Sequence, residues 1–200
     1  VPQNYGTLEE AFAAAGSGDE IIIEPGTYTI DNPEGINLYS KKLRIVSAGP
    51  DDPNYINNTI IDLRSQGRAF VFSREGSSDS ALIGLTFING LTVGDLEIED
   101  GDAYGGAVLC ENGSSPLIKN CRFINNAVVG ARGADGAAGD DAPAGSGDSG
   151  DRGADALPSE SHGCGGAIAC IEESSPKIVN CYFEGNTARS GDGGDGGDGG

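Results

Sequence analysis

A segment of 22 residues occurs twice in this chain, at positions sixty residues apart. It reads GGAVLCENGSSPLIKNCRFINN over residues 105–126 and GGAIACIEESSPKIVNCYFEGN over residues 165–186, and 12 of the 22 positions are identical. An earlier segment, RAFVFSREGSSDSALIGLTFING at residues 68–90, aligns with both copies if an insertion of two residues is allowed at the turn between its strands. Because a repeat of this length is one supersecondary unit, we expect each copy to be one turn of a coil stacked on its neighbour.

The local pattern inside these turns favours strands. Short β-branched or aromatic segments, such as INLYS, KLRIVSA, NTIIDL and AFVFS, are separated by Gly, Asp, Asn or Pro. Stacked turns would place equivalent apolar residues at intervals of about 4.8 Å. We therefore predict an all-β parallel β-helix (solenoid). Its expected ladders join Val108 to Ile168, Ile118 to Ile178, and Phe123 to Phe183.

A single helical pattern precedes the strands. Thr7-Leu8-Glu9-Glu10 is a capping box, and Leu8, Ala11, Phe12 and Ala15 form one apolar stripe. We expect this helix, residues 7–15, to cover the first exposed end of the coil, where open strand edges would otherwise promote aggregation.

The expected organisation is one domain over residues 1–200. Coils occupy residues 20–126 and 163–188, and Gly/Asp-rich insertions occupy residues 127–162 and 189–200. A further coil is expected after the last one, which would make this the amino-terminal portion of a longer protein.

Two tetrapeptides in each copy resemble those of a known family. GGAV at 105–108 and GGAI at 165–168, each followed by Phe-x-x-Asn (123–126 and 183–186), are similar to the paired tetrapeptides of polymorphic-outer-membrane-protein repeats. More broadly, the chain resembles bacterial secreted proteins of the pectin-lyase-like superfamily. This resemblance implies a right-handed parallel β-helix at the cell surface or outside the cell. It implies no particular chemistry, because that superfamily contains lyases, hydrolases, adhesins and inert stalks.

Four of the five cysteines belong to the repeat, with one pair in each copy. The earlier segment has Phe72 and Leu85 at the two equivalent positions, so both cysteines are absent together. This covariation predicts disulfides within each copy, Cys110–Cys121 and Cys170–Cys181, as expected in an oxidising compartment. Buried thiols are one alternative. Pairs between stacked turns, 110 with 170 and 121 with 181, are another, and Cys164 is left over.

Glycine recurs every third residue in the insertions. A three-residue period suits an extended, polyproline-II-like conformation in which glycine permits close lateral packing. Such segments could bundle and act as assembly loops, and a disordered acidic spacer is the alternative. The glycines concerned are Gly130, Gly133, Gly136, Gly139, Gly191, Gly194, Gly197 and Gly200.

The strongly negative net charge of the chain indicates which classes of ligand it could bind. The net charge is −19, which argues against nucleic acid as a partner and favours divalent cations. One loop, GDLEIEDGDAYGG, gathers carboxylates on a glycine-flexible backbone, which suits Ca²⁺; a solvated acidic loop is the alternative. No cofactor is required. The candidate calcium ligands are Asp95, Glu97, Glu99, Asp100 and Asp102.

Enzymatic activity is the minority interpretation. Gly139-Asp140-Asp141 and Ser161-His162-Gly163 resemble motifs of β-helix pectin hydrolases, but the aspartates lie in a Gly/Ala/Asp/Ser-rich stretch without a strand pattern to hold them. We therefore expect a non-catalytic extracellular structural protein, a rigid rod or fibre element with projecting loops for assembly or adhesion. It would associate with itself or with other surface proteins. The alternative is a carbohydrate-binding or carbohydrate-active β-helix, with a polysaccharide as ligand. No apolar run is long enough to span a membrane.

Overall fold

A computed structural model describes residues 1–39, 41–73, 79–95, 101–138 and 161–195. The described chain is mostly β-strand, and its packing divides it into two compact units. The first unit comprises Val1–Thr92, Tyr104–Val128 and Cys164–Ala188. The second comprises Val93–Ala103, Val129–Gly163 and Arg189–Gly200.

The chain enters the first unit through helix α1 (Leu8–Ala14), as the sequence predicts. The Thr7 hydroxyl accepts a hydrogen bond from the Glu10 amide at 3.1 Å, and the Glu10 carboxylate accepts one from the Thr7 amide at 3.4 Å, which completes the capping box. Leu8 and Phe12 are buried, and the Phe12 ring lies 5.2 Å from the ring of Phe70. The helix is thus fixed to the strands by its apolar stripe.

A second helix, α2 (Pro53–Asn58), was not predicted from the sequence. It begins at an Asp52 cap followed directly by proline, a combination that starts helices well. None of its residues is buried, so it has no apolar stripe by which a sequence pattern could reveal it.

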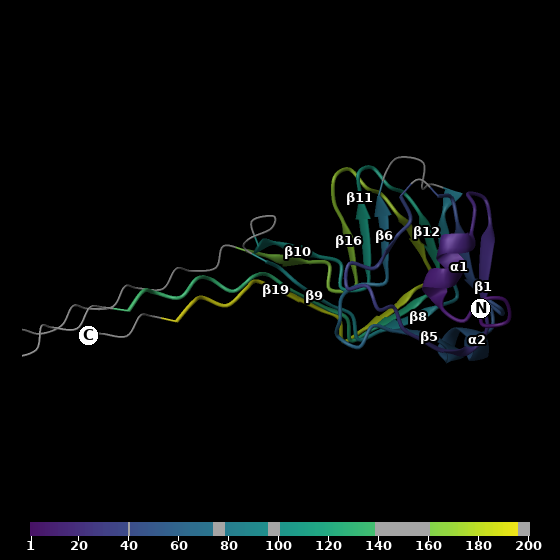
Figure 1. The fold of residues 1–200 in the computed structure, drawn as a ribbon, viewed down its shortest axis with the longest axis horizontal. Coiled ribbons are helices and arrows are strands. Elements are labelled where there is room, and N and C mark those ends of the chain that lie inside the picture. Colours follow the sequence, from purple (N-terminus) through teal and green to yellow (C-terminus); the bar gives the residue numbers. More distant parts are fainter. Residues whose placement is uncertain (40, 74–78, 96–100, 139–160, 196–200) are drawn as a thin grey trace, which may run out of the picture. The chain divides into compact units, whose positions relative to one another are not determined.

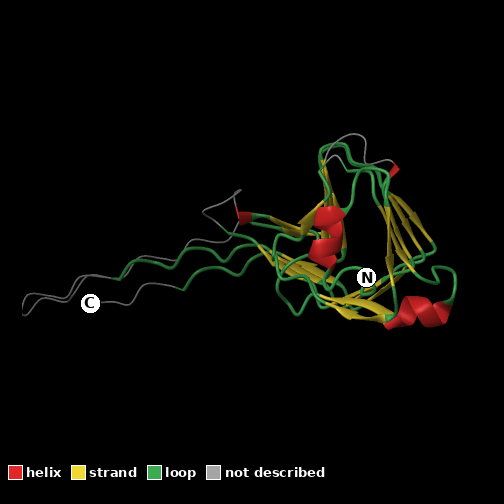
Figure 2. Cartoon of the chain, turned by 45° about the vertical axis from the view of Figure 1, so that its right-hand side comes forward, coloured by secondary structure: helices red, strands yellow, loops and turns green. Residues whose placement is uncertain are grey.

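Three sheets receive strands from the chain in rotation (Figures 1 and 2). The first has the order β1 (Glu20–Ile23), β4 (Arg44–Ser47), β7 (Ala81–Ile83), β12 (Leu117–Lys119), β17 (Lys177–Val179). The second has the order β2 (Gly26–Tyr28), β5 (Thr59–Asp62), β8 (Thr86–Ile88), β13 (Arg122–Ile124), β18 (Tyr182–Glu184). The third has the order β3 (Ile36–Asn37), β6 (Phe70–Ser73), β11 (Val108–Glu111), β16 (Ile168–Cys170).

Neighbouring strands in these three sheets run parallel. We call each passage of the chain through the sheets a coil. Two smaller sheets complete the described strands. One joins β9 (Leu91–Val93), β14 (Ala127–Val129) and β19 (Thr187–Arg189), and the other joins β10 (Ala103–Tyr104) and β15 (Gly163–Cys164).

The register between coils follows the sequence repeat. Val108 pairs with Ile168, Ile118 with Ile178, and Phe123 with Phe183, as predicted. The earlier, divergent copy is also in register, because Phe72 is the strand partner of Cys110 and Phe87 that of Phe123. Parallel pairing of equivalent residues is therefore confirmed for all three copies.

Phenylalanine forms a continuous stack in the interior of the first unit. The rings of Phe87 and Phe123 are 5.1 Å apart with planes 10° from parallel, and those of Phe123 and Phe183 are 5.1 Å apart at 11°. Phe87 and Phe123 are fully buried, whereas Phe183 keeps 47% of its surface exposed. Each of the three repeat copies thus supplies one ring to the stack, and the rings of Phe123 and Phe183 each lie over the ring of the copy before.

The stack predicts unequal losses of stability along the coil axis. Phe123→Ala should lower the free energy of unfolding by about 3–5 kcal/mol, because it leaves a cavity between two rings. Phe183→Ala is the matched control and should lose clearly less, because only one face of its ring is covered. Urea unfolding followed by circular dichroism measures both, and equal losses would contradict the stacked arrangement.

Candidate functional site

The last coil of the first unit, Cys164–Ala188, has a face that no other described residues cover, and we call it the open coil. Among the described strands, β16, β17 and β18 each have a neighbour in their sheet on one side only. Ile178 is 44% exposed and Phe183 47%, although their partners Ile118 and Phe123 are fully buried. Within the described part of the chain, the open coil therefore exposes side chains whose equivalents in the preceding coil are buried.

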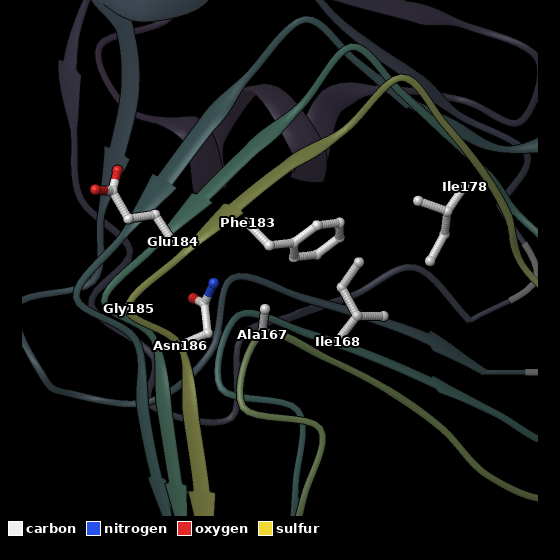
Figure 3. A pocket seen from close by; sticks show the side chains of 7 residues that line it. All are labelled: Ala167, Ile168, Ile178, Phe183, Glu184, Gly185 and Asn186. Carbon is white, nitrogen blue, oxygen red and sulfur yellow. The ribbon is translucent and has the colours of Figure 1, made fainter.

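These side chains surround a hollow of about 360 Å³. Figure 3 shows Phe183, Ile168 and Ile178 directed into it from three directions, with Glu184 directed away. Apart from one amide and the Glu184 carboxylate, which is directed away, the lining side chains are aliphatic or aromatic, so the hollow offers packing rather than acid–base chemistry. The lining residues are Ala167, Ile168, Ile178, Phe183, Glu184, Gly185 and Asn186.

An asparagine ladder runs beside the phenylalanine stack. Asn126 is fully buried, and its amide nitrogen Nδ2 donates to Oδ1 of Asn186 at 2.9 Å. The Asn126 backbone amide also donates to that oxygen at 3.0 Å, while Asn186 Nδ2 donates to the Phe123 carbonyl at 2.8 Å. Each asparagine thus joins its twin and the backbone of the preceding coil. Our sequence interpretation missed this role, although the Phe-x-x-Asn tetrapeptide signalled it.

A second asparagine pair lies at the bend before the repeat's second cysteine. Asn120 and Asn180 have φ angles of 54° and 52°, a left-handed conformation that asparagine tolerates better than most residues. Asn180 Nδ2 donates to Asn120 Oδ1 at 2.8 Å. Asn120 Nδ2 in turn donates to the Pro50 carbonyl at 2.9 Å, so this pair links the bends of successive coils to each other and to the backbone.

The cysteines of the repeat are neighbours of their equivalents in the next coil rather than of the other cysteine in the same coil. All five lie among the described residues and are free thiols, so the predicted Cys110–Cys121 and Cys170–Cys181 disulfides are not formed. Cys110 and Cys170 are direct strand partners. In a stacked fold the nearest neighbour of a side chain is its equivalent in the next coil, which corrects the pairing inferred from covariation.

Hydrogen bonds between the thiols shift their pKa values in opposite directions. The bond between Cys110 and Cys170 lowers the pKa of Cys170 to about 7 and, together with burial, raises the pKa of Cys110. The bond between Cys121 and Cys181 likewise lowers the pKa of Cys181 to about 7. Burial is the largest cause of the raised pKa of Cys121, followed by that hydrogen bond. The sulfur in the open coil therefore has the greater thiolate character in each pair.

The predicted calcium loop is only partly described. Glu97, Glu99 and Asp100 lie outside the described residues, whereas Asp95 and Asp102 belong to the second unit. Asp102 Oδ1 accepts a hydrogen bond from the His162 backbone amide at 2.7 Å and lies 3.5 Å from His162 Nδ1. Within the described ranges, no group of three His, Cys, Asp or Glu side chains could hold a metal ion. Calcium binding by the whole loop stays a prediction.

Glycine amides in the second unit pair two extended segments at three-residue intervals. Gly130 donates to the Arg189 carbonyl at 3.0 Å, Gly133 to Asp192 at 2.8 Å, and Gly136 to Asp195 at 2.7 Å. Gly191 donates to the Ser161 carbonyl at 3.3 Å, whereas Gly139, Gly197 and Gly200 lie outside the described residues. The described glycines thus act as a ladder of backbone donors, which we call the glycine ladder (Gly130, Gly133 and Gly136).

Close chain approach accounts for glycine at two positions of this unit, Gly130 and Gly194. A Cβ atom on Gly194 would lie 1.9 Å from the Ala134 carbonyl oxygen, and one on Gly130 would lie 2.6 Å from that of Ser161. An ion-pair cluster accompanies the ladder: the Arg132 guanidinium contacts Asp135 at 2.6 Å and Asp195 at 2.8 Å. Asp135 Oδ1 also accepts from the Asp195 amide at 2.8 Å, and this bond is the largest cause of the lowered pKa of Asp135.

The residues that resemble a hydrolase motif are only partly described. Gly139-Asp140-Asp141 lies outside the described residues. Ser161 is buried, and its hydroxyl donates to the Ala131 carbonyl at 2.6 Å. This hydroxyl therefore serves the packing of the second unit.

Comparisons with known proteins give no relative: no family model, no curated protein and no solved structure matches the chain. Among the described residues, no helix is both long enough and apolar enough to span a membrane.

The glycine ladder predicts that alanine substitutions at two adjacent glycines, Gly193 and Gly194, have different effects on amide exchange. Gly194→Ala should separate the paired segments, because its Cβ would overlap the Ala134 carbonyl. The amides of Gly133 and Gly136 should then exchange with deuterium as fast as those of an unfolded chain. Gly193→Ala is the control, because nothing lies within 4 Å of a Cβ there. Unchanged protection in the Gly194 variant, measured by NMR, would show that the segments are not packed as described.

Proposed function

We propose that this chain is a non-catalytic structural protein built as a right-handed parallel β-helix. Its role is to form a rigid element that extends by stacking one coil on another. The open coil is the surface through which it extends, and the partner is a parallel coil of the same repeat. The exposed Ile178 and Phe183, whose equivalents one coil earlier are fully buried, are the observation that carries this proposal.

The hollow fits a coil better than a small ligand. Of the four apolar side chains that line it, Ala167, Ile168, Ile178 and Phe183, three have strand partners in the preceding coil that are fully buried. The lining thus repeats a packing surface that already exists inside the protein. A parallel coil would add a fourth ring to the Phe87–Phe123–Phe183 stack at the same spacing of about 5 Å.

Backbone groups point to the same partner. Inside the stack, the Tyr182 amide donates to the Cys121 carbonyl and the Thr187 amide to the Asn126 carbonyl, each at 2.9 Å. The equivalent carbonyls of the open coil belong to Cys181 and Asn186, on an edge where a further parallel strand can pair. The asparagine ladder would continue by the same rule.

The second unit supports an assembly role of a different kind. Its glycine ladder joins equivalent segments of neighbouring repeats without contributing an apolar core, and Arg132 bridges two carboxylates there. Each added repeat would bring one more such segment. We place the protein outside the bacterial cell or on its surface, where a net charge of −19 favours solubility and hydration of such a rod.

Addition of one repeat tests the proposal. A second copy of residues 130–189 is joined directly after Arg189, so that every residue keeps its sixty-residue register. Ile178 and Phe183 become covered, which should raise the free energy of unfolding by about 2–3 kcal/mol from their burial alone, since full burial of one such side chain contributes about 1.5–3 kcal/mol. Urea unfolding measures the change.

The matched control has the same added repeat, but Ile178 and Phe183 of the original open coil are each replaced by aspartate (Ile178→Asp and Phe183→Asp). It should gain no stability from the addition, because charged side chains would be trapped between coils. An added repeat that stays sensitive to protease and leaves stability unchanged in the unsubstituted protein would refute growth by stacking.

A further inference from the structure

We propose that the two thiol pairs between the last coils are sites of disulfide formation, Cys110 with Cys170 and Cys121 with Cys181, which lock the open coil to the stack. This inference goes beyond the structural role proposed above. It rests on the arrangement of the four thiols and does not require that any further coil be added.

Strand register brings the first pair within bonding range. Cys110 and Cys170 are direct partners on the parallel strands β11 and β16. Neighbouring strands lie about 4.8 Å apart, and the Cα atoms of a disulfide lie about 4.4–6.8 Å apart. Direct partners on parallel strands point to the same face of the sheet, so the two cysteine side chains lie side by side.

The second pair has the same arrangement. Lys119 pairs with Val179 and Arg122 with Tyr182, which places Cys121 opposite Cys181 between these two pairs of partners. The Cys121 thiol donates to the Leu82 and Lys119 carbonyls, and the Cys181 thiol donates to the equivalent carbonyls of Ile118 and Val179. The two sulfurs therefore occupy equivalent places in successive coils. Neither pair competes with the other, because Cys110 and Cys170 are partners on β11 and β16, whereas Cys121 and Cys181 directly precede β13 and β18 in a different part of each coil.

The two thiols of the first pair differ in exposure, which gives them different roles in the reaction. Cys170 is exposed and Cys110 is fully buried. The hydrogen bond from Cys110 favours the thiolate of Cys170, so the accessible sulfur is also the more nucleophilic one at neutral pH. Cys170 is therefore the attacking thiol and Cys110 the resolving thiol.

A small-molecule disulfide, such as oxidised glutathione, is the oxidant. The Cys170 thiolate attacks one of its sulfurs, the S–S bond of the oxidant breaks, and one small thiol leaves with a proton from solvent. The Cys110 thiol then loses its proton and attacks the Cys170 sulfur, which expels the second small thiol. The protein pair loses two electrons and two protons, and the oxidant gains both to become two thiols.

The open coil gains stability from such a bond. Among the described strands, its own have a neighbour on one side only, and regions with fewer packing partners open first. A covalent bond to the preceding coil at two separate points would prevent this local opening. Since a further coil would cover Cys170, oxidation is expected before such a coil is added.

Peptide mapping tests the pairing. The protein with Cys164→Ser, which removes the exposed fifth thiol, is incubated with oxidised glutathione and digested with trypsin without reduction. Cleavage after Lys119, Arg122 and Lys177 separates the four remaining cysteines. Mass spectrometry should find peptides that link Cys110 to Cys170 and Cys121 to Cys181. Links within a coil, stable glutathione adducts on Cys170, or unreacted thiols would each overturn the proposal.

A variant separates the two roles. With Cys110→Ala added, Cys170 lacks its resolving partner and should accumulate a stable mixed disulfide with glutathione. The pH midpoint of its alkylation by iodoacetamide should also move from about 7 to the ordinary thiol value of about 8.5. Cys121→Ala is the matched control and should leave both the midpoint of Cys170 and the Cys110–Cys170 bond unchanged. If the pH midpoint of Cys170 alkylation is the same with and without the Cys110→Ala substitution, the assigned roles are contradicted.

Discussion

Hydrogen bonds between the backbones of neighbouring coils are the interaction on which the rest of the first unit depends. Lys177 donates to Pro116, Tyr182 to Cys121 and Thr187 to Asn126, each at 2.9 Å. In all three cases the donor lies 61 positions after the acceptor (for example 182 − 121 = 61). A constant offset across three strands means that one coil lies on the next without a slip in register, and this determines which side chains meet.

The interior follows from that register. A phenylalanine ring meets the ring of its twin, an asparagine amide meets its twin, and a thiol meets its twin. Identical residues are well suited to such ladders, because flat rings stack and an amide carries both a donor and an acceptor. The repeat is therefore preserved most clearly at positions where side chains touch across coils. The same rule leaves the open coil with exposed apolar side chains, Ile178 and Phe183, at positions that the preceding coil buries.

Much of this arrangement could be predicted from the sequence, because a sixty-residue repeat directly encodes the pairing of Phe123 with Phe183 and of Ile118 with Ile178. The capping box at Thr7 could be predicted equally well, since its two side chains are only three residues apart in the sequence. The cysteine pairing was not, because the joint loss of Cys110 and Cys121 in the earlier copy shows that the two positions covary and does not show which thiols touch. Helix α2 was missed because it buries nothing, and Asn126 was missed because its burial depends on the bend that follows Phe123. The role of Gly194 depends on Ala134, sixty positions away, which no local pattern reveals.

Detection of scalar couplings through hydrogen bonds, from a long-range HNCO experiment on isotope-labelled protein, tests the central claim most directly. Stacked parallel coils predict couplings from the Tyr182 amide to the Cys121 carbonyl and from the Thr187 amide to the Asn126 carbonyl. Couplings from these amides to any other carbonyls, or the reciprocal pairs typical of antiparallel strands, would contradict the account.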